Sequence, residues 1–233
     1  MLAVCAAAPE ASAESDVPHT ELFTGFEASD NYASGYVGAG YAFGKGLYDP
    51  GFRLRVVGAY GRYHYDGTLF TGGVFVPTRF DGQVGYGAAL IGYQFHPGAV
   101  IVKLFAGIEG EDQHIVPRDP NNSVQGSALG ARLLAETWYD ISPNWFASAD
   151  TSYGTAFQEY FGLARLGFRV RPKLSLGLEG GVLGNEEYDA GRGGGFVRVN
   201  VRNFEATLSG GFTGNYLEDE PSGYVAIGLY QTF

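Results

Sequence analysis

The chain ends in Gly223-Tyr-Val-Ala-Ile-Gly-Leu-Tyr-Gln-Thr-Phe233, a stretch in which residue character alternates. Successive side chains of a strand point to opposite faces. One face therefore carries Val225, Ile227, Leu229 and Phe233, and the other carries Tyr224, Ala226, Gly228, Tyr230 and Thr232. Chain ends usually fray, so an end this apolar must be covered. A last strand that closes a barrel in a lipid bilayer has a hydrogen-bonded partner and an apolar solvent for its outward face.

The composition agrees with such a barrel. The 233 residues include 37 Gly, 16 Tyr and 17 Phe, against only 15 Lys and Arg together. The sequence has no apolar run of about 18 residues, which excludes a helical membrane protein. Frequent glycines also disfavour helices, because Gly costs roughly 1 kcal/mol relative to Ala inside a helix.

Period-two patterns and turn residues divide the chain into twelve expected strands. They lie near 21–28, 32–44, 52–64, 82–95, 99–110, 124–139, 145–153, 158–170, 173–183, 193–202, 204–214 and 223–233. Short connections alternate with a second set that is mostly longer and polar, such as 65–81, 111–123, 184–192 and 215–222. The sequence therefore predicts an all-β fold: a closed antiparallel transmembrane β-barrel of about twelve strands, with short periplasmic turns and longer acidic outer loops. A soluble β-sandwich is the weaker alternative, because the polar faces lack a Lys- and Glu-rich coat.

The first residues predict export. Residues 1–13 resemble the end of a signal peptide, with Ala11-Ser12-Ala13 as a small-x-small cleavage pattern. Residues 14–20 are then an N-terminal tail, and 21–233 form the barrel. Leu2-Ala-Val-Cys5 resembles a lipoprotein box only weakly, because Val4 is large for the position before the cysteine. Cleavage after Ala13 would leave a mature chain without cysteine, which excludes disulfides and thiolate chemistry.

Negative charge is concentrated in the expected outer loops. They hold twelve acidic residues, including Glu111, against three basic ones, including Arg192. An acidic rim argues against nucleic acid as a partner, because nucleic acids bind basic patches. It suits outer-membrane lipid and lipopolysaccharide bridged by divalent cations, or a neutral polysaccharide.

A second group of charges lies inside the expected strands. A charge on the lipid face costs roughly 2–4 kcal/mol at mid-membrane, so these side chains are expected to point into the lumen. They are Arg53, Arg55, Lys103, Glu109, Arg132, Glu136, Asp150, Arg165, Arg169, Glu179, Arg198 and Glu205. They would either line an open channel or form ion pairs that fill a closed lumen.

The sequence gives little support to an enzyme. The histidines are His19, His64, His96 and His114, and only His64 and His114 fall toward the outer side, where Ser123, Ser127 and Ser152 are the serines to consider. No nucleophile–base pair and no metal-ligand spacing is apparent, so no catalytic residue, metal or cofactor is assigned.

The order of several motifs resembles a known family. In sequence order they are Pro50-Gly-Phe-Arg-Leu-Arg-Val-Val-Gly-Ala-Tyr-Gly-Arg-Tyr-His-Tyr-Asp-Gly67, Gly92-Tyr-Gln-Phe95, Phe105-Ala-Gly-Ile-Glu-Gly110, Pro117-Arg-Asp-Pro-Asn-Asn122, Gly130-Ala-Arg-Leu-Leu-Ala-Glu-Thr-Trp-Tyr139, Ala147-Ser-Ala-Asp-Thr-Ser-Tyr153 and Leu176-Gly-Leu-Glu-Gly-Gly181. Over roughly 21–233 the chain is similar to the cellulose biosynthesis protein BcsS family of alphaproteobacteria. The resemblance implies an outer-membrane protein that works with bacterial cellulose synthase components. It brings no catalytic residues with it.

The leading hypothesis is an outer-membrane accessory of cellulose biosynthesis and secretion, as an export channel or a surface anchor. Tyr63, Tyr224 and Tyr230 share inward faces and are the candidates for contact with a glucan. A general or substrate-specific porin is the main alternative. Two further alternatives are an outer-membrane hydrolase and a structural barrel whose loops 65–81 and 111–123 dock a partner.

Overall fold

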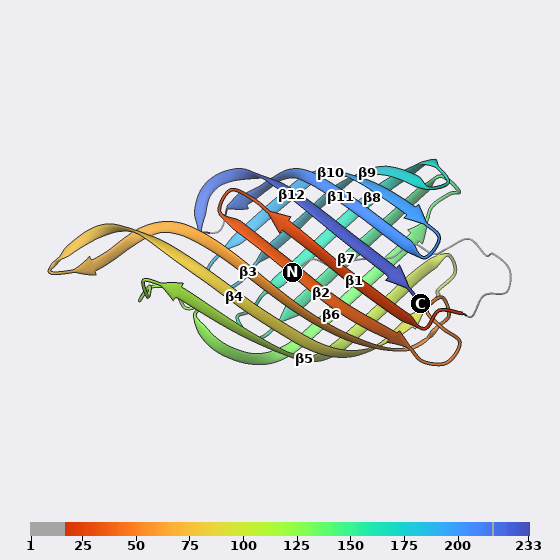
Figure 1. The fold of residues 1–233 in the computed structure, drawn as a ribbon, viewed down its shortest axis with the longest axis horizontal. Coiled ribbons are helices and arrows are strands. Elements are labelled where there is room, and N and C mark those ends of the chain that lie inside the picture. The colour runs from red at the N-terminus through yellow and green to blue at the C-terminus, as the bar shows by residue number, and fades with distance from the viewer. Residues whose placement is uncertain (1–16, 216) are drawn as a thin grey trace.

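The computed structural model describes residues 17–215 and 217–233. The signal peptide and most of the tail predicted for residues 1–20 lie outside the described residues. The described chain forms twelve antiparallel strands that close into one barrel, because β1 pairs with both β2 and β12 (Figure 1). The strands are β1 Thr20–Ala28, β2 Tyr32–Ala42, β3 Gly51–Thr71, β4 Val74–Phe95, β5 Val100–Val116, β6 Gly126–Asp140, β7 Trp145–Gly154, β8 Tyr160–Arg171, β9 Leu174–Gly184, β10 Asp189–Val201, β11 Phe204–Asn215 and β12 Glu218–Thr232. The predicted fold class and strand number are confirmed. None of the described residues belongs to a helix long and apolar enough to cross a membrane.

The C-terminal strand closes the barrel. Phe23 of β1 lies opposite Tyr230 of β12, and Phe26 lies opposite Ile227. The backbone amide of Phe233 donates to the carbonyl of Thr20 at 2.9 Å, which ties the two ends of the described chain together. Closure of the described strands leaves no unpaired sheet edge along the wall, which is the condition for strands to span a bilayer.

The outward face is apolar. Its exposed side chains include Val37, Ile108, Leu129, Leu178 and Phe212, of which Leu129 is 90 % exposed. Aromatic pairs lie near the short-turn end, such as Phe52 with Tyr93 and Trp145 with Phe168, with ring centroids 5.1 and 5.0 Å apart. An apolar band bordered by aromatic residues matches the surface that a bilayer covers. Leu90 and Ile91, which point to opposite faces, are 1 % and 58 % exposed respectively, so β4 turns Leu90 inward and Ile91 toward lipid.

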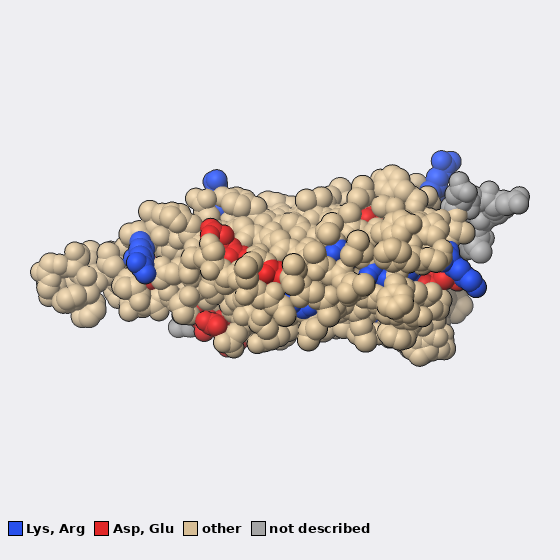
Figure 2. Space-filling view, turned by 90° about the horizontal axis from the view of Figure 1, so that it is seen from below, with Lys and Arg blue, Asp and Glu red and all other residues tan. Residues whose placement is uncertain are grey.

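The connections differ from the sequence prediction at one end of the barrel. At the end that holds Thr20 and Phe233, most links between strands are short, as at 96–99, 141–144 and 202–203, while the link at 43–50 is longer. At the opposite end, much of what was predicted as loop is strand. Residues 65–81 form the upper part of a long hairpin of β3 and β4, and β5 continues to Val116. This hairpin projects beyond the rest of the barrel (Figure 1). Its tip is an uncharged projection (Figure 2), because residues 67–78 contain no acidic or basic side chain.

Candidate functional site

The twelve charged residues predicted to face the lumen all lie on strands of the wall. Nine are buried in the interior of the barrel: Arg53, Arg55, Glu109, Arg132, Glu136, Asp150, Glu179, Arg198 and Glu205. Lys103 and Arg165 are nearly so, with side chains 12 % and 9 % exposed. Arg169 lies nearer the short-turn end, where it pairs with Asp140 and donates to the carbonyl of Pro143 at 3.1 Å.

One group of these charges bridges strands that are not neighbours. Arg55 of β3 makes an ion pair with Glu136 of β6 and a second with Glu21 of β1, the latter at 3.1 Å. The ammonium group of Lys103 on β5 lies 3.6 Å from Glu136 and 4.0 Å from Glu21. These side chains reach across the lumen, because β1, β3 and β6 do not pair with one another. We call Glu21, Arg55, Lys103 and Glu136 the cross-lumen cluster.

A second group centres on Glu179 of β9. Its carboxylate accepts from Arg165 at 2.8 Å, from the hydroxyl of Tyr224 at 2.6 Å and from that of Ser209 at 3.1 Å. Arg192 of β10 lies 3.5 Å from the same carboxylate and pairs with Glu27 of β1 at 2.9 Å. A buried carboxylate needs this number of partners to offset its lost hydration.

Arg132 has no exposed surface and joins the wall to an outer loop. Its guanidinium pairs with Glu109 of β5 and with Glu159 of the link between β7 and β8, both at 2.5 Å. It also donates to the hydroxyl of Ser152 at 3.3 Å. Breaking such a network leaves a buried charge without its partner.

Aromatic rings fill the interior toward the short-turn end. Trp138 of β6 stacks on Phe146 of β7 with centroids 4.5 Å apart, and Phe196 of β10 packs against Phe146. The guanidinium of Arg198 lies 5.3 to 5.5 Å from the centroids of these three rings and pairs with Glu205 at 3.2 Å. Asp150 is also buried here, and neither of its carboxylate oxygens has a hydrogen-bond partner among the described residues.

The sequence analysis misplaced or missed several interior charges. Arg192 and Glu111 were predicted in outer loops, but both are buried in the barrel, because β10 begins at Asp189 and β5 extends past Glu111. Glu21 and Glu27 were not identified at all. Alternation could have predicted their inward placement, since Glu21, Phe23, Gly25 and Glu27 alternate with Leu22, Thr24 and Phe26.

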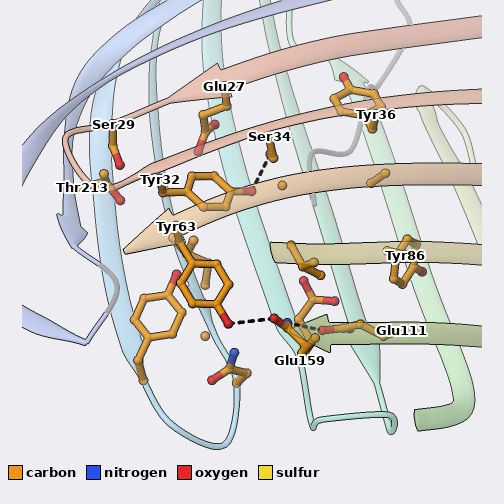
Figure 3. A pocket seen from close by; sticks show the side chains of 18 of the residues that line it. Glu27, Ser29, Tyr32, Ser34, Tyr36, Tyr63, Tyr86, Glu111, Glu159 and Thr213 are labelled. Carbon is orange, nitrogen blue, oxygen red and sulfur yellow. Dashed lines mark hydrogen bonds between the residues drawn. The ribbon is translucent and has the colours of Figure 1, made fainter. Parts of the chain in front are cut away.

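A cavity opens at the end of the lumen opposite the short turns. We call it the vestibule; its empty volume is about 1040 Å³, part of it open to solvent. The lining residues come from β1 to β5, from the outer ends of β8, β9 and β11, and from the outer links (Figure 3). They include Glu27, Ser29, Asn31, Tyr32, Ser34, Tyr36, Tyr63, Tyr86, Glu111, Gln113, Glu159, Asn185, Tyr188 and Thr213. The lining thus combines tyrosine rings, carboxylates and uncharged polar groups.

The hydrogen bonds of the vestibule hold its rings and carboxylates in place. The hydroxyl of Tyr63 donates to Gln113 at 2.9 Å, and the amide of Gln113 donates to Glu111 at 2.6 Å. Tyr32 donates to the hydroxyl of Ser34 on the same strand (Figure 3). Side chains fixed in this way lose little rotamer freedom when they contact a ligand.

The three tyrosines predicted to contact a glucan lie at different depths. Tyr63 lines the vestibule. Tyr230 donates to Glu21 at 2.9 Å, and Tyr224 donates to Glu179 while the guanidinium of Arg192 covers its ring at 4.0 Å. Tyr224 and Tyr230 are therefore engaged by the interior charges and do not border the vestibule.

The residues considered for a hydrolase do not form a catalytic arrangement. Ser127 donates to Asp112, Ser123 donates to Glu187, and Ser152 accepts from Arg132. His64 and His114 lie on β3 and β5, each facing away from the buried residues on either side of it, Tyr63 and Tyr65 or Gln113 and Ile115. No group of three or more potential metal ligands occurs within 17–215 and 217–233.

Comparison with known proteins identifies a family and a fold. The family model described as "Cellulose biosynthesis protein BcsS" matches residues 21–233. No curated protein matches the sequence. Among solved structures, the KdgM porin is similar with a TM-score of 0.52 and 9 % identity, covering 91 % of this chain and 99 % of that one. The translocator domain of the autotransporter NalP from Neisseria meningitidis has a TM-score of 0.52 and 10 % identity, covering 92 % and 88 %. At these identities the likeness shows a shared barrel fold and nothing more.

Proposed function

Because the chain belongs to the cellulose biosynthesis protein BcsS family, we propose that it is an outer-membrane accessory of cellulose secretion whose lumen is closed to free passage. In this role the barrel receives or holds the polymer at the cell surface, as an anchor, and is not itself an open export channel. Its closed wall and apolar outer band suit residence in the outer membrane.

The observation that carries the proposal is the cross-lumen cluster. The side chains of Arg55 and Glu136 are 6 % and 1 % exposed, although they belong to strands three places apart in the barrel. Side chains that line a water-filled channel stay hydrated. Two opposite charges that lose their water are retained only when they satisfy each other. The pairing therefore favours a barrel whose lumen is blocked at the cross-lumen cluster.

Planar-bilayer recording tests this closure. The purified chain is expected to give no steady conductance. The double variant Arg55→Ser/Glu136→Ser shortens both partners, while Lys103 and Glu21 remain to pair with each other. This variant is expected to conduct. The matched control is Arg79→Ser/Asp81→Ser, which removes an exposed pair on β4 and should stay silent. A steady conductance of the unaltered chain, equal to that of the double variant, would favour a porin instead.

The cellular role is tested separately. A deletion strain is expected to lose cellulose from its surface, and the unaltered chain is expected to restore it. If surface cellulose is normal without the protein, a role in its secretion is excluded, whatever the bilayer recordings give.

An export conduit is the second candidate, and one observation favours it. A smaller cavity, with an empty volume of about 400 Å³, lies on the other side of Tyr36 and is lined by Arg165, Arg198, Glu205 and Tyr230 among others. Tyr36 borders both cavities, so Tyr36→Ala would join them. More cellulose released by cells with this variant than by the parent strain would favour a conduit, and an unchanged amount would favour the closed accessory.

A further inference from the structure

We propose that the vestibule binds the end of a neutral chain of pyranose sugars, which enters from the outer side. The identification of that chain as a β-linked glucan rests on the proposed function. The preference for a neutral sugar over an acidic or basic one rests on the vestibule alone.

The tyrosines supply flat apolar surfaces. Tyr32 and Tyr36 of β2, Tyr63 of β3 and Tyr86 of β4 line the cavity (Figure 3). Tyr188, in the link between β9 and β10, also lines it. A pyranose ring has two faces made largely of C–H groups, which pack against aromatic rings. Tyrosine suits such a site because its ring is apolar and its tip is polar.

The carboxylates supply acceptors for sugar hydroxyls. Glu27, Glu111 and Glu159 reach the cavity from β1, β5 and the link between β7 and β8. Glu27 is paired with Arg192 and Glu159 with Arg132, and these two arginines do not line the cavity. Most of the negative charge is therefore already balanced, which leaves little attraction for a free cation. A carboxylate can still accept from a hydroxyl while one of its oxygens is bound to a guanidinium.

The same lining disfavours an acidic sugar. Neither arginine nor lysine is among the described residues that line the vestibule, so a carboxylate ligand would find no cationic partner there. A charged group that loses its hydration without such a partner is strongly disfavoured. A neutral, hydroxyl-rich chain avoids this cost.

The vestibule ends at Tyr36. The ring of Tyr36 lies over Gly25, the residue directly opposite it on β1, so closely that a Cβ on Gly25 would meet the ring at 2.5 Å. The ring is buried and packs with Phe23, Val57 and Tyr230 in one apolar cluster. A sugar chain that enters from the outer loops is expected to stop at this ring, so the vestibule holds a chain end.

Isothermal titration calorimetry on the purified protein in detergent tests the inference. The probes are cellohexaose as the neutral sugar, oligogalacturonate as the acidic one and a glucosamine oligomer as the basic one. We expect binding of cellohexaose and no heat from the other two. In Tyr32→Ala/Tyr86→Ala, two stacking surfaces are lost, and affinity for cellohexaose should fall by about tenfold or more. Tyr86→Phe keeps the ring and should bind nearly as the unaltered chain does.

The matched control is Tyr139→Ala. Tyr139 is exposed near the far end of β6, outside the vestibule, so its loss should leave affinity unchanged. Heat-modifiable gel mobility confirms that each variant is a folded barrel. If Tyr32→Ala/Tyr86→Ala does not fold, Glu111→Gln is used, and weaker cellohexaose binding is again expected.

The outcomes separate this inference from the proposed function. Absence of cellohexaose binding, or equal binding of oligogalacturonate, overturns the neutral-sugar site even if the deletion strain lacks surface cellulose. Cellohexaose binding that Tyr32→Ala/Tyr86→Ala abolishes supports the site, even if the deletion strain has normal cellulose and the proposed function fails.

Discussion

Glycines opposite aromatic side chains explain much of the packing inside this barrel. Phe146 of β7 lies directly opposite Gly167 of β8, and a Cβ added to Gly167 would lie 2.2 Å from the ring. The same arrangement pairs Phe23 with Gly38, Tyr63 with Gly82, Phe105 with Gly92, and Phe196 with Gly177. A ring that lies flat over a glycine covers the backbone there and turns its edge toward the lumen. The recurrent strand glycines thus allow large rings to fit inside the wall.

We predict that Gly167→Ala destabilises the barrel. The added methyl group forces Phe146 off its stack with Trp138, and overpacking of this kind typically costs about 1–3 kcal/mol. Urea unfolding of the protein reconstituted in lipid vesicles measures the loss. Gly58→Ala is the control, since its Cβ would have no neighbour nearer than 3.8 Å. Equal stability of the two variants would contradict the role given to Gly167.

Residue placement was partly readable from the sequence. Alternation was enough to direct Arg132, Glu136 and Glu179 inward. Alternation did not predict which side chains they contact, because a single sequence does not show which residues of distant strands meet across the lumen. The predictions for Glu111 and Arg192 were wrong because charged residues near a turn were assigned to loops. Both residues lie on strands that extend beyond the expected boundary.

The long β3–β4 hairpin is the main departure at the level of elements. Tyr63 is the last residue of β3 that pairs with β2, and Asp81 is the first residue of β4 that pairs with β5. The two strands continue alone to a turn at Gly72 and Gly73, whose φ values are +61° and +84°. Positive φ at both positions is typical of the tight turn that joins twisted strands. Gly67, Gly72, Gly73 and Pro77, residue types typical of turns, concealed this pairing in the sequence.

We predict that the tip of this hairpin is dispensable for the barrel. Replacing residues 70–75 with a two-residue Asn-Gly turn removes the contact between Phe70 and Phe75, whose centroids are 5.0 Å apart, and leaves the wall intact. The free energy of unfolding measured in urea should change by less than about 0.5 kcal/mol, as for surface substitutions in general. A large loss of stability would show that the tip supports the wall.

The whole barrel has a definite orientation to test. An even number of strands places both ends of the described chain on one side, with the short turns, and the long hairpin on the other. We expect the hairpin side to face the exterior, as is usual for outer-membrane barrels.

Single cysteines at exposed positions measure this orientation on intact cells, with Cys5 replaced by Ser. A membrane-impermeant maleimide should label Gly72→Cys and Asn121→Cys. It should not label Gly98→Cys or Asn203→Cys until the cells are broken. The reverse pattern would invert the barrel and move the vestibule to the periplasmic side.

At this scale the sequence was most informative. Period-two alternation, the apolar C-terminal strand and the alternating lengths of the connections were sufficient for a closed barrel of twelve strands. These patterns did not show whether the lumen is open or closed. An open and a filled interior have the same inward charges and differ only in which of these charges contact one another.

The contacts that bridge the lumen come from side chains of the wall itself within the described chain. These side chains cannot leave the lumen together as one rigid body, because each belongs to a strand whose backbone groups are already hydrogen-bonded within the wall. Permeability would then change one side chain at a time, without any rearrangement of the scaffold. Natural relatives with the same strands but fewer inward arginines and glutamates should accordingly range from sealed to leaky, and their conductance should follow how many of these bridges each has kept.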